Sequence, residues 1–244
     1  MQSLHVIMCK EDLDPAKVEG RVAVVFDVLF ATSTIAAAFH HGVTDVIPAR
    51  QAEEARQAAE GLAAGSFLFA GEIDLRPIPG FLPSVPLRLI REPLAGKRLI
   101  YSTTNGTVAL LRAKPAAAVY AAALVNGRAV ASQLTSRHHH ETVLLICAGS
   151  GGAFNIEDFL GAGHVIHHLM LAEPTRWAPS DAALAARELY RAQASQLAQC
   201  LLESRLGRIM QALGEAAEVE HAAQTDIYDC VPVLQGQRLV ATEL

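Results

Sequence analysis

The chain has 244 residues, of which 51% are hydrophobic, 18% are charged and only 5% are aromatic. This composition excludes a disordered chain, which combines few apolar side chains with a high net charge. A formal net charge of −5 excludes a protein-wide basic surface for sequence-independent binding of nucleic acid. No run approaches the roughly eighteen apolar residues of a membrane span, so we expect neither nucleic acid nor membrane as a partner.

The N-terminal stretch 1–15 has no basic start followed by an apolar run, so the sequence predicts no secretion signal. The four cysteines are scattered and form no CxxC pair. Both features are typical of a cytoplasmic protein with reduced thiols.

Short aliphatic runs alternate with helical patterns over most of the chain. The predicted strands are Leu4–Met8, Val22–Leu29, Val43–Pro48, Ser66–Ala70, Arg98–Tyr101, Ala117–Ala121 and Thr142–Cys147. The predicted helices are Thr32–His41, Gln51–Ala63, Thr107–Ala113, Asn126–Thr135, Glu157–Leu171 and Ser180–Met210. This alternation predicts a layered α/β/α fold with a largely parallel or mixed central sheet.

Two segments depart from the alternation. Residues 72–93 contain five prolines, which predicts an ordered loop without regular elements. The tail 227–241 predicts a strand, a turn at Gln235–Gly236 and a second strand. Because no flexible linker is present, we expect one compact domain over residues 1–244, or two closely packed lobes.

Four polar loops follow predicted strands, where ligands bind in doubly wound sheets. In the first, Asp27 ends an apolar strand, and a buried carboxylate there needs a metal, an arginine or backbone donors. Thr32 and Ser33 open the next helix, whose free N–H groups favour an anion. The alternative is a structural turn and helix cap.

The second loop places Glu72 directly after Gly71 at the end of a strand. Glu72 is a candidate metal ligand or general acid–base group. The alternative is a solvated loop carboxylate.

The third loop reads STTNGT over 102–107 and leads from a strand into a helix. Asn105 and Gly106 tolerate positive φ, which allows successive N–H groups to converge on an anion. The alternative is an ordinary strand-to-helix turn.

The fourth loop, GSGG over 149–152, follows the most apolar strand, and Glu157 and Asp158 lie in the first turn of the next helix. These carboxylates would repel a phosphate unless a divalent cation lay between them. Mg²⁺ takes one or two carboxylates together with substrate phosphate oxygens, so the combination favours metal-assisted phosphate chemistry.

Histidines occur as adjacent runs at 40–41, 138–140 and 167–168. Adjacent side chains point in different directions, so we interpret these histidines as structural or solvated. No Ser-His-Asp order and no catalytic-cysteine signature is present, which disfavours a nucleophilic hydrolase.

The four loops, in this order, resemble the 2-phosphosulfolactate phosphatase family. The matching stretches are FDVLFATST (26–34), AGE (70–72), IPGF (78–81), STTNGT (102–107), CAGSGGAFNIEDFLGAG (147–163) and DIYDCVPVL (226–234). The resemblance implies a layered α/β enzyme, cytoplasmic and homo-oligomeric, acting in a coenzyme M pathway in some organisms. It implies Mg²⁺-dependent hydrolysis of a small anionic phosphate ester to 3-sulfolactate and inorganic phosphate.

Carried onto this chain, the resemblance implies catalytic roles for Asp27, Glu72, Glu157 and Asp158, with Asp27, Glu72 and Asp158 as metal ligands. Asp226 and Asp229 match an acidic pair of the family before the terminal VPVL. The implied substrate-binding residues are Thr32, Ser33, Thr103, Thr104, Asn105, Gly106, Thr107, Asn126, Gly149, Ser150 and Gly151.

The chain departs from the family at the anion site. Phe30 and Ile73 stand where the family has arginine, and 80–86 lacks an aspartate, a glycine and an asparagine. Arginine is the side chain best shaped to bind phosphate or sulfonate, and Arg76 or Arg88 is a candidate replacement. Three hypotheses follow: a phosphatase of this family, a divergent paralogue acting on another phosphate monoester, and an inactive anion-binding homologue.

Overall fold

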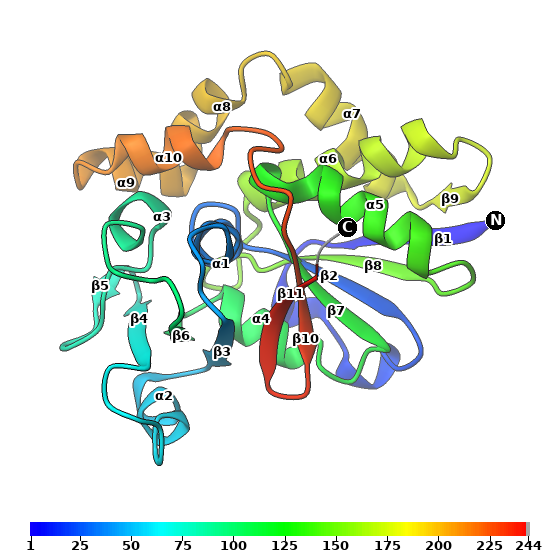
Figure 1. Ribbon diagram of the computed structural model, residues 1–244. Helices are drawn as coiled ribbons and strands as arrows, with labels where there is room; N and C mark the ends of the chain where they lie inside the picture. Colours follow the sequence, from blue (N-terminus) through cyan, green and yellow to red (C-terminus); the bar gives the residue numbers. More distant parts are fainter. Residues whose placement is uncertain (243–244) are drawn as a thin grey trace.

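The computed structural model describes residues 1–242, and in them one mixed sheet of eleven strands runs through the molecule with helices on both faces (Figure 1). The predicted layered α/β fold is therefore confirmed. The strand order is β5 (Arg76–Pro77), β4 (Phe67–Ile73), β6 (Arg98–Ser102), β3 (Asp45–Ala49), β11 (Arg238–Thr242), β10 (Val231–Gln235), β7 (Ala118–Ala122), β2 (Val22–Phe26), β8 (Val143–Cys147), β1 (Gln2–Ile7) and β9 (Trp177–Pro179).

The helices lie in the connections between these strands and in the C-terminal third of the chain. They are α1 (Ala31–His40), α2 (Ala52–Ala58), α3 (Pro86–Leu89), α4 (Gly106–Arg112), α5 (Gly127–Arg137), α6 (Ile156–Ala172), α7 (Asp181–Gln193), α8 (Leu197–Glu203), α9 (Arg205–Ala212) and α10 (Ala216–Ala222). Short 3₁₀ turns occur at Lys10–Asp12, Pro15–Lys17 and Leu124–Asn126. Within residues 1–242 no helix combines the length and the apolar character that crossing a bilayer requires.

The sheet consists of two parallel blocks joined by the C-terminal hairpin. One block is β4, β6 and β3, and the other is β7, β2, β8, β1 and β9. The hairpin β10–β11 pairs antiparallel with both, through Val233 opposite Tyr120 and Leu239 opposite Val46. Three successive antiparallel pairings make the blocks run in opposite senses. The accumulated twist of the sheet, visible as the fan of strands in Figure 1, sets them at an angle to each other.

The central strand β2 shows why these residues form a covered sheet. All five of its side chains are buried. Because successive side chains point to opposite faces, Val22, Val24 and Phe26 pack into one apolar layer, and Ala23 and Val25 pack into the other. Such double burial is typical of a parallel strand covered by helices.

The predicted loop over residues 72–93 is partly wrong, because β4 extends to Ile73, β5 is a two-residue edge strand and α3 is a helical turn. The prolines fit these elements. Pro77 lies on an edge strand, and Pro86 is the first residue of α3, where no amide donor is needed.

The single helix predicted over 180–210 is also wrong, because the structure divides it into α7, α8 and α9. Ser204 starts α9: its hydroxyl accepts a hydrogen bond from the Gly207 amide at 2.9 Å. Ser204 is the last residue before a new helix begins, and the spacing of apolar residues alone does not reveal such a break. The strand–turn–strand tail is confirmed as β10 and β11.

Helices α6 and α7 pack closely at Gly163. A methyl group added there would overlap the Ala186 carbonyl oxygen and the Tyr190 Cβ. We predict that Gly163→Ala lowers the free energy of unfolding by about 1–3 kcal/mol, although alanine is the better helix former. Urea unfolding measures this change. The exposed Ala185→Gly reports helix propensity alone, and an unchanged stability of Gly163→Ala would contradict the close packing.

Candidate functional site

The four polar loops singled out in the sequence meet at one place, although they come from both parallel blocks. Gly106, after β6, packs so closely on Asp27 and Ala31, after β2, that an added Cβ would overlap both. Asp158, at the start of α6, accepts the Val28 amide at 2.9 Å and the Gly149 amide at 3.1 Å. These contacts connect the loops after β2, β6 and β8.

Glu72 connects the remaining loop, which follows β4, to this group. Its Oε1 accepts the Thr104 amide at 2.7 Å, and its Oε2 accepts the Leu75 amide at 2.6 Å and the Thr104 hydroxyl at 3.3 Å. Asp74 and Leu75 both have positive φ, of 50° and 64°. A leucine in this region is strained, and the bond from its amide to Glu72 helps to hold the turn in place.

Asp27 and Glu72 form a buried pair of carboxylates, each 6% exposed. Burial and, second, the charge of Glu72 raise the pKa of Asp27 to about 7, although the amides of Ala31 and Gly106 oppose the shift. Such a pair is a functional-site candidate because two nearby acids outside water need a proton or a cation between them.

Glu157 and Asp158 lie beside this pair. Burial raises the pKa of both carboxyls, and the charge of Asp27 also raises that of Asp158. Glu157 Oε1 is buried without a hydrogen-bond partner in the described part of the chain. Glu157 is therefore the side chain here with an acceptor atom to spare, whereas both Asp158 oxygens are used to fasten two loops.

Most of the predicted substrate-binding hydroxyls are buried and bonded within their own loops. Thr32 accepts the Asp27 amide at 3.0 Å, and Ser33 donates to the Val28 carbonyl at 2.6 Å. Thr103 and Thr107 bond each other's amides reciprocally, at 3.0 and 3.2 Å. These hydroxyls shape the loops around Asp27, and their direct contact with a substrate stays a prediction.

The remaining predicted substrate-binding residues also form hydrogen bonds or tight turns that shape the loops. Asn126 uses its side chain on the Ala123 amide and on the Ala121 and Cys230 carbonyls, so it ties β7 to the tail. In the glycine loop, Ser150 and Ala153 exchange backbone hydrogen bonds of 3.0 and 3.1 Å. Gly149, Gly151 and Gly152 have positive φ, which gives the loop its tight turn.

Two cations that the sequence reasoning missed border these loops. Lys10 is 6% exposed; its Nζ donates to the Asn105 side chain at 2.8 Å and to the Ala148 carbonyl at 3.4 Å. Arg205, from α9, donates to Asn155 at 3.0 Å and to the Ser150 carbonyl at 3.4 Å. Lys10 lies three residues after the end of β1, so a search of the loops after all strands could have found it. No sequence signal pointed to Arg205.

One of the two positions where the family has arginine borders a mainly apolar cavity of about 220 Å³, which Glu72 also lines. Phe30 lines it, whereas Ile73 is 48% exposed. Of the two candidate replacements, Arg88 lines the cavity but is paired with Glu215 at 2.8 Å, and Arg76 is exposed on β5.

The structure also gathers two histidines that the adjacent runs did not single out as a pair. Among residues 1–242 the only three potential metal ligands with atoms within 4.8 Å of one another are His164, His168 and Asp226. Asp27, Glu72 and Asp158 are not gathered that closely. His164 and His168 are spaced i, i+4 on α6, which places them on one face of the helix, and this spacing is readable from the sequence.

The raised pKa of Asp27 predicts how the stability of the protein depends on pH. Asp27 binds its proton more tightly in the folded state than the ordinary pKa of 3.8 allows, so folding is favoured while it is protonated. We predict that chelator-treated wild type loses stability as pH rises from about 5 to about 8, and that Asp27→Asn loses less.

Urea unfolding across this pH range measures the difference, with the exposed Glu60→Gln as the matched control. Parallel stability curves for wild type and Asp27→Asn would contradict a raised pKa at Asp27.

Comparison with known proteins adds an independent finding. A family model described as "2-phosphosulpholactate phosphatase" matches residues 7–237. A protein of Symbiobacterium thermophilum is 36% identical over 235 residues, covering 95% of this chain and 99% of the relative. One of Clostridium beijerinckii is 30% identical, covering 94% and 95%, and one of Thermotoga petrophila is 36% identical, covering 89% and 90%. All three are named "Probable 2-phosphosulfolactate phosphatase".

Proposed function

This chain belongs to the 2-phosphosulfolactate phosphatase family, and on that premise we propose that it is a Mg²⁺-dependent phosphatase converting 2-phosphosulfolactate to 3-sulfolactate and phosphate. The observation that carries the proposal is the buried Asp27–Glu72 pair surrounded by backbone amides. Cytoplasmic location and a homo-oligomeric assembly stay predictions from the resemblance.

The donor set fits magnesium. Mg²⁺ is bound by one or two carboxylates together with waters and phosphate oxygens. Asp27 and Glu72 supply two hard oxygen ligands whose mutual repulsion a cation would relieve. Asp158 is a third candidate ligand; like Glu72, it accepts a backbone amide on each of its two oxygens. When bound, the ion polarises the phosphoryl group and offsets its charge.

The other residues bind the substrate and move a proton. Glu157 has a raised pKa and a spare buried oxygen, which suits a general acid that protonates the leaving oxygen of the ester. The STTNGT and glycine loops place backbone dipoles around the site, where they stabilise developing negative charge. Asp158 positions the loops after β2 and β8 relative to each other.

Substrate anions need cations, and we expect Arg205 and Lys10 to supply them in place of the missing family arginines, with Lys10 exchanging its 2.7 Å ion pair with Glu11 for the substrate. Both already bond carbonyl or amide oxygens of the loops after β6 and β8. A charge-assisted hydrogen bond contributes about 1.5–3 kcal/mol, which corresponds to roughly a 10- to 100-fold change in affinity.

The second candidate is a paralogue acting on a less anionic phosphate monoester. The apolar cavity beside Glu72, lined by Phe30, Phe81 and Leu82, favours it. Such a wall would accept an alkyl group in preference to a sulfonate.

We predict that Asp27→Asn and Glu72→Gln each lower Mg²⁺-dependent phosphate release by about 100-fold or more, because each removes a ligand charge from the reacting centre. Phosphate release from 2-phosphosulfolactate at varied Mg²⁺ measures this. The exposed Glu60→Gln is expected to match wild type. Full activity in Asp27→Asn would remove that residue from the mechanism, and wild type inactive on all phosphate esters would favour an anion-binding homologue.

We predict that Lys10→Met and Arg205→Ala each raise KM for 2-phosphosulfolactate about 10- to 100-fold, since each deletes a cation at the substrate. Arg208→Ala is the matched control, because Arg208 is an exposed arginine of the same helix. Comparison with phospholactate, which lacks the sulfonate, separates the two candidate functions. A higher kcat/KM for phospholactate would establish the paralogue.

A further inference from the structure

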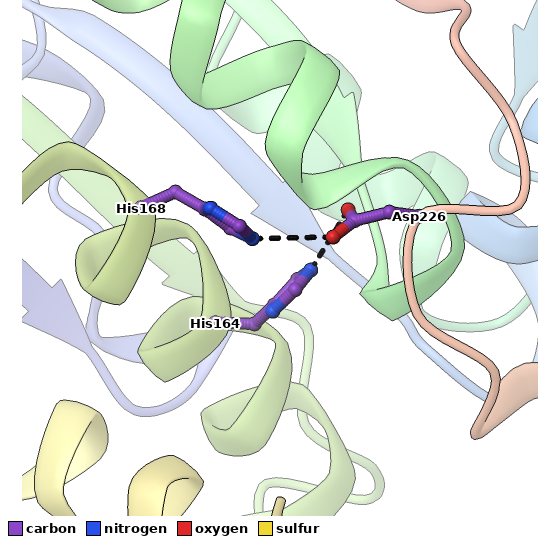
Figure 2. A group of neighbouring side chains, drawn as sticks. All are labelled: His164, His168 and Asp226. Atoms are coloured by element: carbon purple, nitrogen blue, oxygen red, sulfur yellow. Dashed lines mark hydrogen bonds and ion pairs between the residues drawn. The ribbon is translucent and has the colours of Figure 1, made fainter. Parts of the chain in front are cut away.

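A second cluster of metal-ligating side chains lies outside the proposed phosphatase site. His164 and His168 project from α6 toward Asp226, which precedes the C-terminal hairpin (Figure 2). His164 Nε2 lies 3.0 Å from Asp226 Oδ1, and His168 Nε2 lies 3.2 Å from Asp226 Oδ2. Two imidazole nitrogens and a carboxylate thus face a common point.

We propose that His164, His168 and Asp226 bind a zinc ion. Zinc is held by imidazole and carboxylate ligands at about 2.0–2.2 Å in tetrahedral geometry, which places neighbouring ligand atoms about 3.3 Å apart. The separations of 3.0 Å from His164 Nε2 to Oδ1 and 3.2 Å from His168 Nε2 to Oδ2 are close to that value, and one ligand atom from each of the three residues lies within 4.8 Å of the others. Two nitrogen ligands select a transition metal such as zinc over Mg²⁺, which prefers oxygen alone.

The helix presents the two histidines together because of their spacing. Residues four apart lie on one face of a helix, and the His164 and His168 rings are 4.7 Å apart in an edge-on arrangement. His167 is not part of the group at Asp226, and its ring lies 5.6 Å from that of Tyr190. This arrangement explains why one histidine of the adjacent pair belongs to the cluster and the other does not.

Asp226 is held in position by the backbone. Its φ of 55° is in the left-handed region, which aspartate tolerates better than most residues. Its amide donates to the Leu124 carbonyl at 3.0 Å, and its Oδ1 also accepts the Arg128 amide at 2.7 Å. The carboxylate is thereby oriented before any ion binds, and the two histidines lower its pKa.

The site is partly enclosed and has an open side. The side chain of His164 is 1% exposed, that of Asp226 is 13% exposed and that of His168 is 22% exposed. His168 also lines a cavity of about 350 Å³ together with Arg128 and Ser132. Three protein ligands and a neighbouring cavity leave room for water as the fourth ligand.

The ion would have a structural consequence. Asp226 lies in the segment that enters β10, and the β10–β11 hairpin joins the two parallel blocks of the sheet. Binding would fasten this segment to α6. Because the ion binds only the folded arrangement, it would raise thermal stability by about 5–10 °C at a hundredfold excess over Kd.

Titration calorimetry tests the proposal with Zn²⁺ as the probe and the untagged, chelator-treated full chain. The background carries His139→Ala and His140→Ala, because these exposed histidines could bind zinc elsewhere. We expect one submicromolar site, weakened at least about 100-fold by His168→Ala or Asp226→Asn. His167→Ala, next to the cluster on the same helix, is expected to bind like the background protein.

Two further readouts keep the result unambiguous. Asn keeps the left-handed backbone and the Arg128 contact, so Asp226→Asn is expected to fold, which circular dichroism checks. Co²⁺ in the same site should give the intense visible absorption of low-coordinate cobalt, and His168→Ala should abolish it. Equal Zn²⁺ affinity in background protein and His168→Ala, equal loss in His167→Ala, or displacement of Zn²⁺ by Mg²⁺ would overturn the proposal.

Discussion

Burying a carboxylate next to a second carboxylate is unfavourable, and the loops around Asp27 are built so that the fold tolerates it. Amides of Ala31 and Gly106 face Asp27, and amides of Leu75 and Thr104 face Glu72. These donors offset only part of the desolvation, since the pKa of Asp27 is still raised. Because part of the desolvation is not offset, the pair is suited to bind a cation or a proton, and the proposed chemistry depends on this property.

The polar residues around this pair divide into two kinds. Thr32, Ser33, Thr103 and Thr107 use their hydroxyls on nearby backbone groups, so they fix the shape of the loops. Glu157 differs, because its buried Oε1 has no partner in the described residues. Rigid loops around a few under-satisfied groups are what a preorganised site requires.

The C-terminal hairpin lies between the two parallel blocks whose loops form this site. The blocks run in opposite senses, and within residues 1–242 one residue pair joins the hairpin to each block in register. The segment that leads into it is bonded at Leu124, Val125 and Arg128, and it carries Asp226 between two histidines of α6. The same tail therefore completes the sheet and creates the second cluster.

The sequence by itself determined the elements and the candidate carboxylates. Strands such as Val22–Phe26 are continuous apolar runs, and burial on both faces makes such runs readable without a structure. Asp27 and Glu72 were recognisable because a carboxylate at the end of an apolar strand needs a partner. The sequence did not predict short edge strands such as β5 or the break at Ser204, because one or two residues are too few to show a hydrophobic period.

Only the tertiary structure decided which polar groups meet. Strand order is not encoded locally, so the opposite senses of the two blocks and the approach of Gly106 to Asp27 depend on the sheet's twist and on the inserted hairpin. Lys10, Arg205 and Asp226 also contact residues that are distant in the sequence, by as much as 138 residues between Lys10 and Ala148. Hydrophobic patterning fixes which face of each element is buried, whereas packing between elements fixes the distances on which chemistry depends.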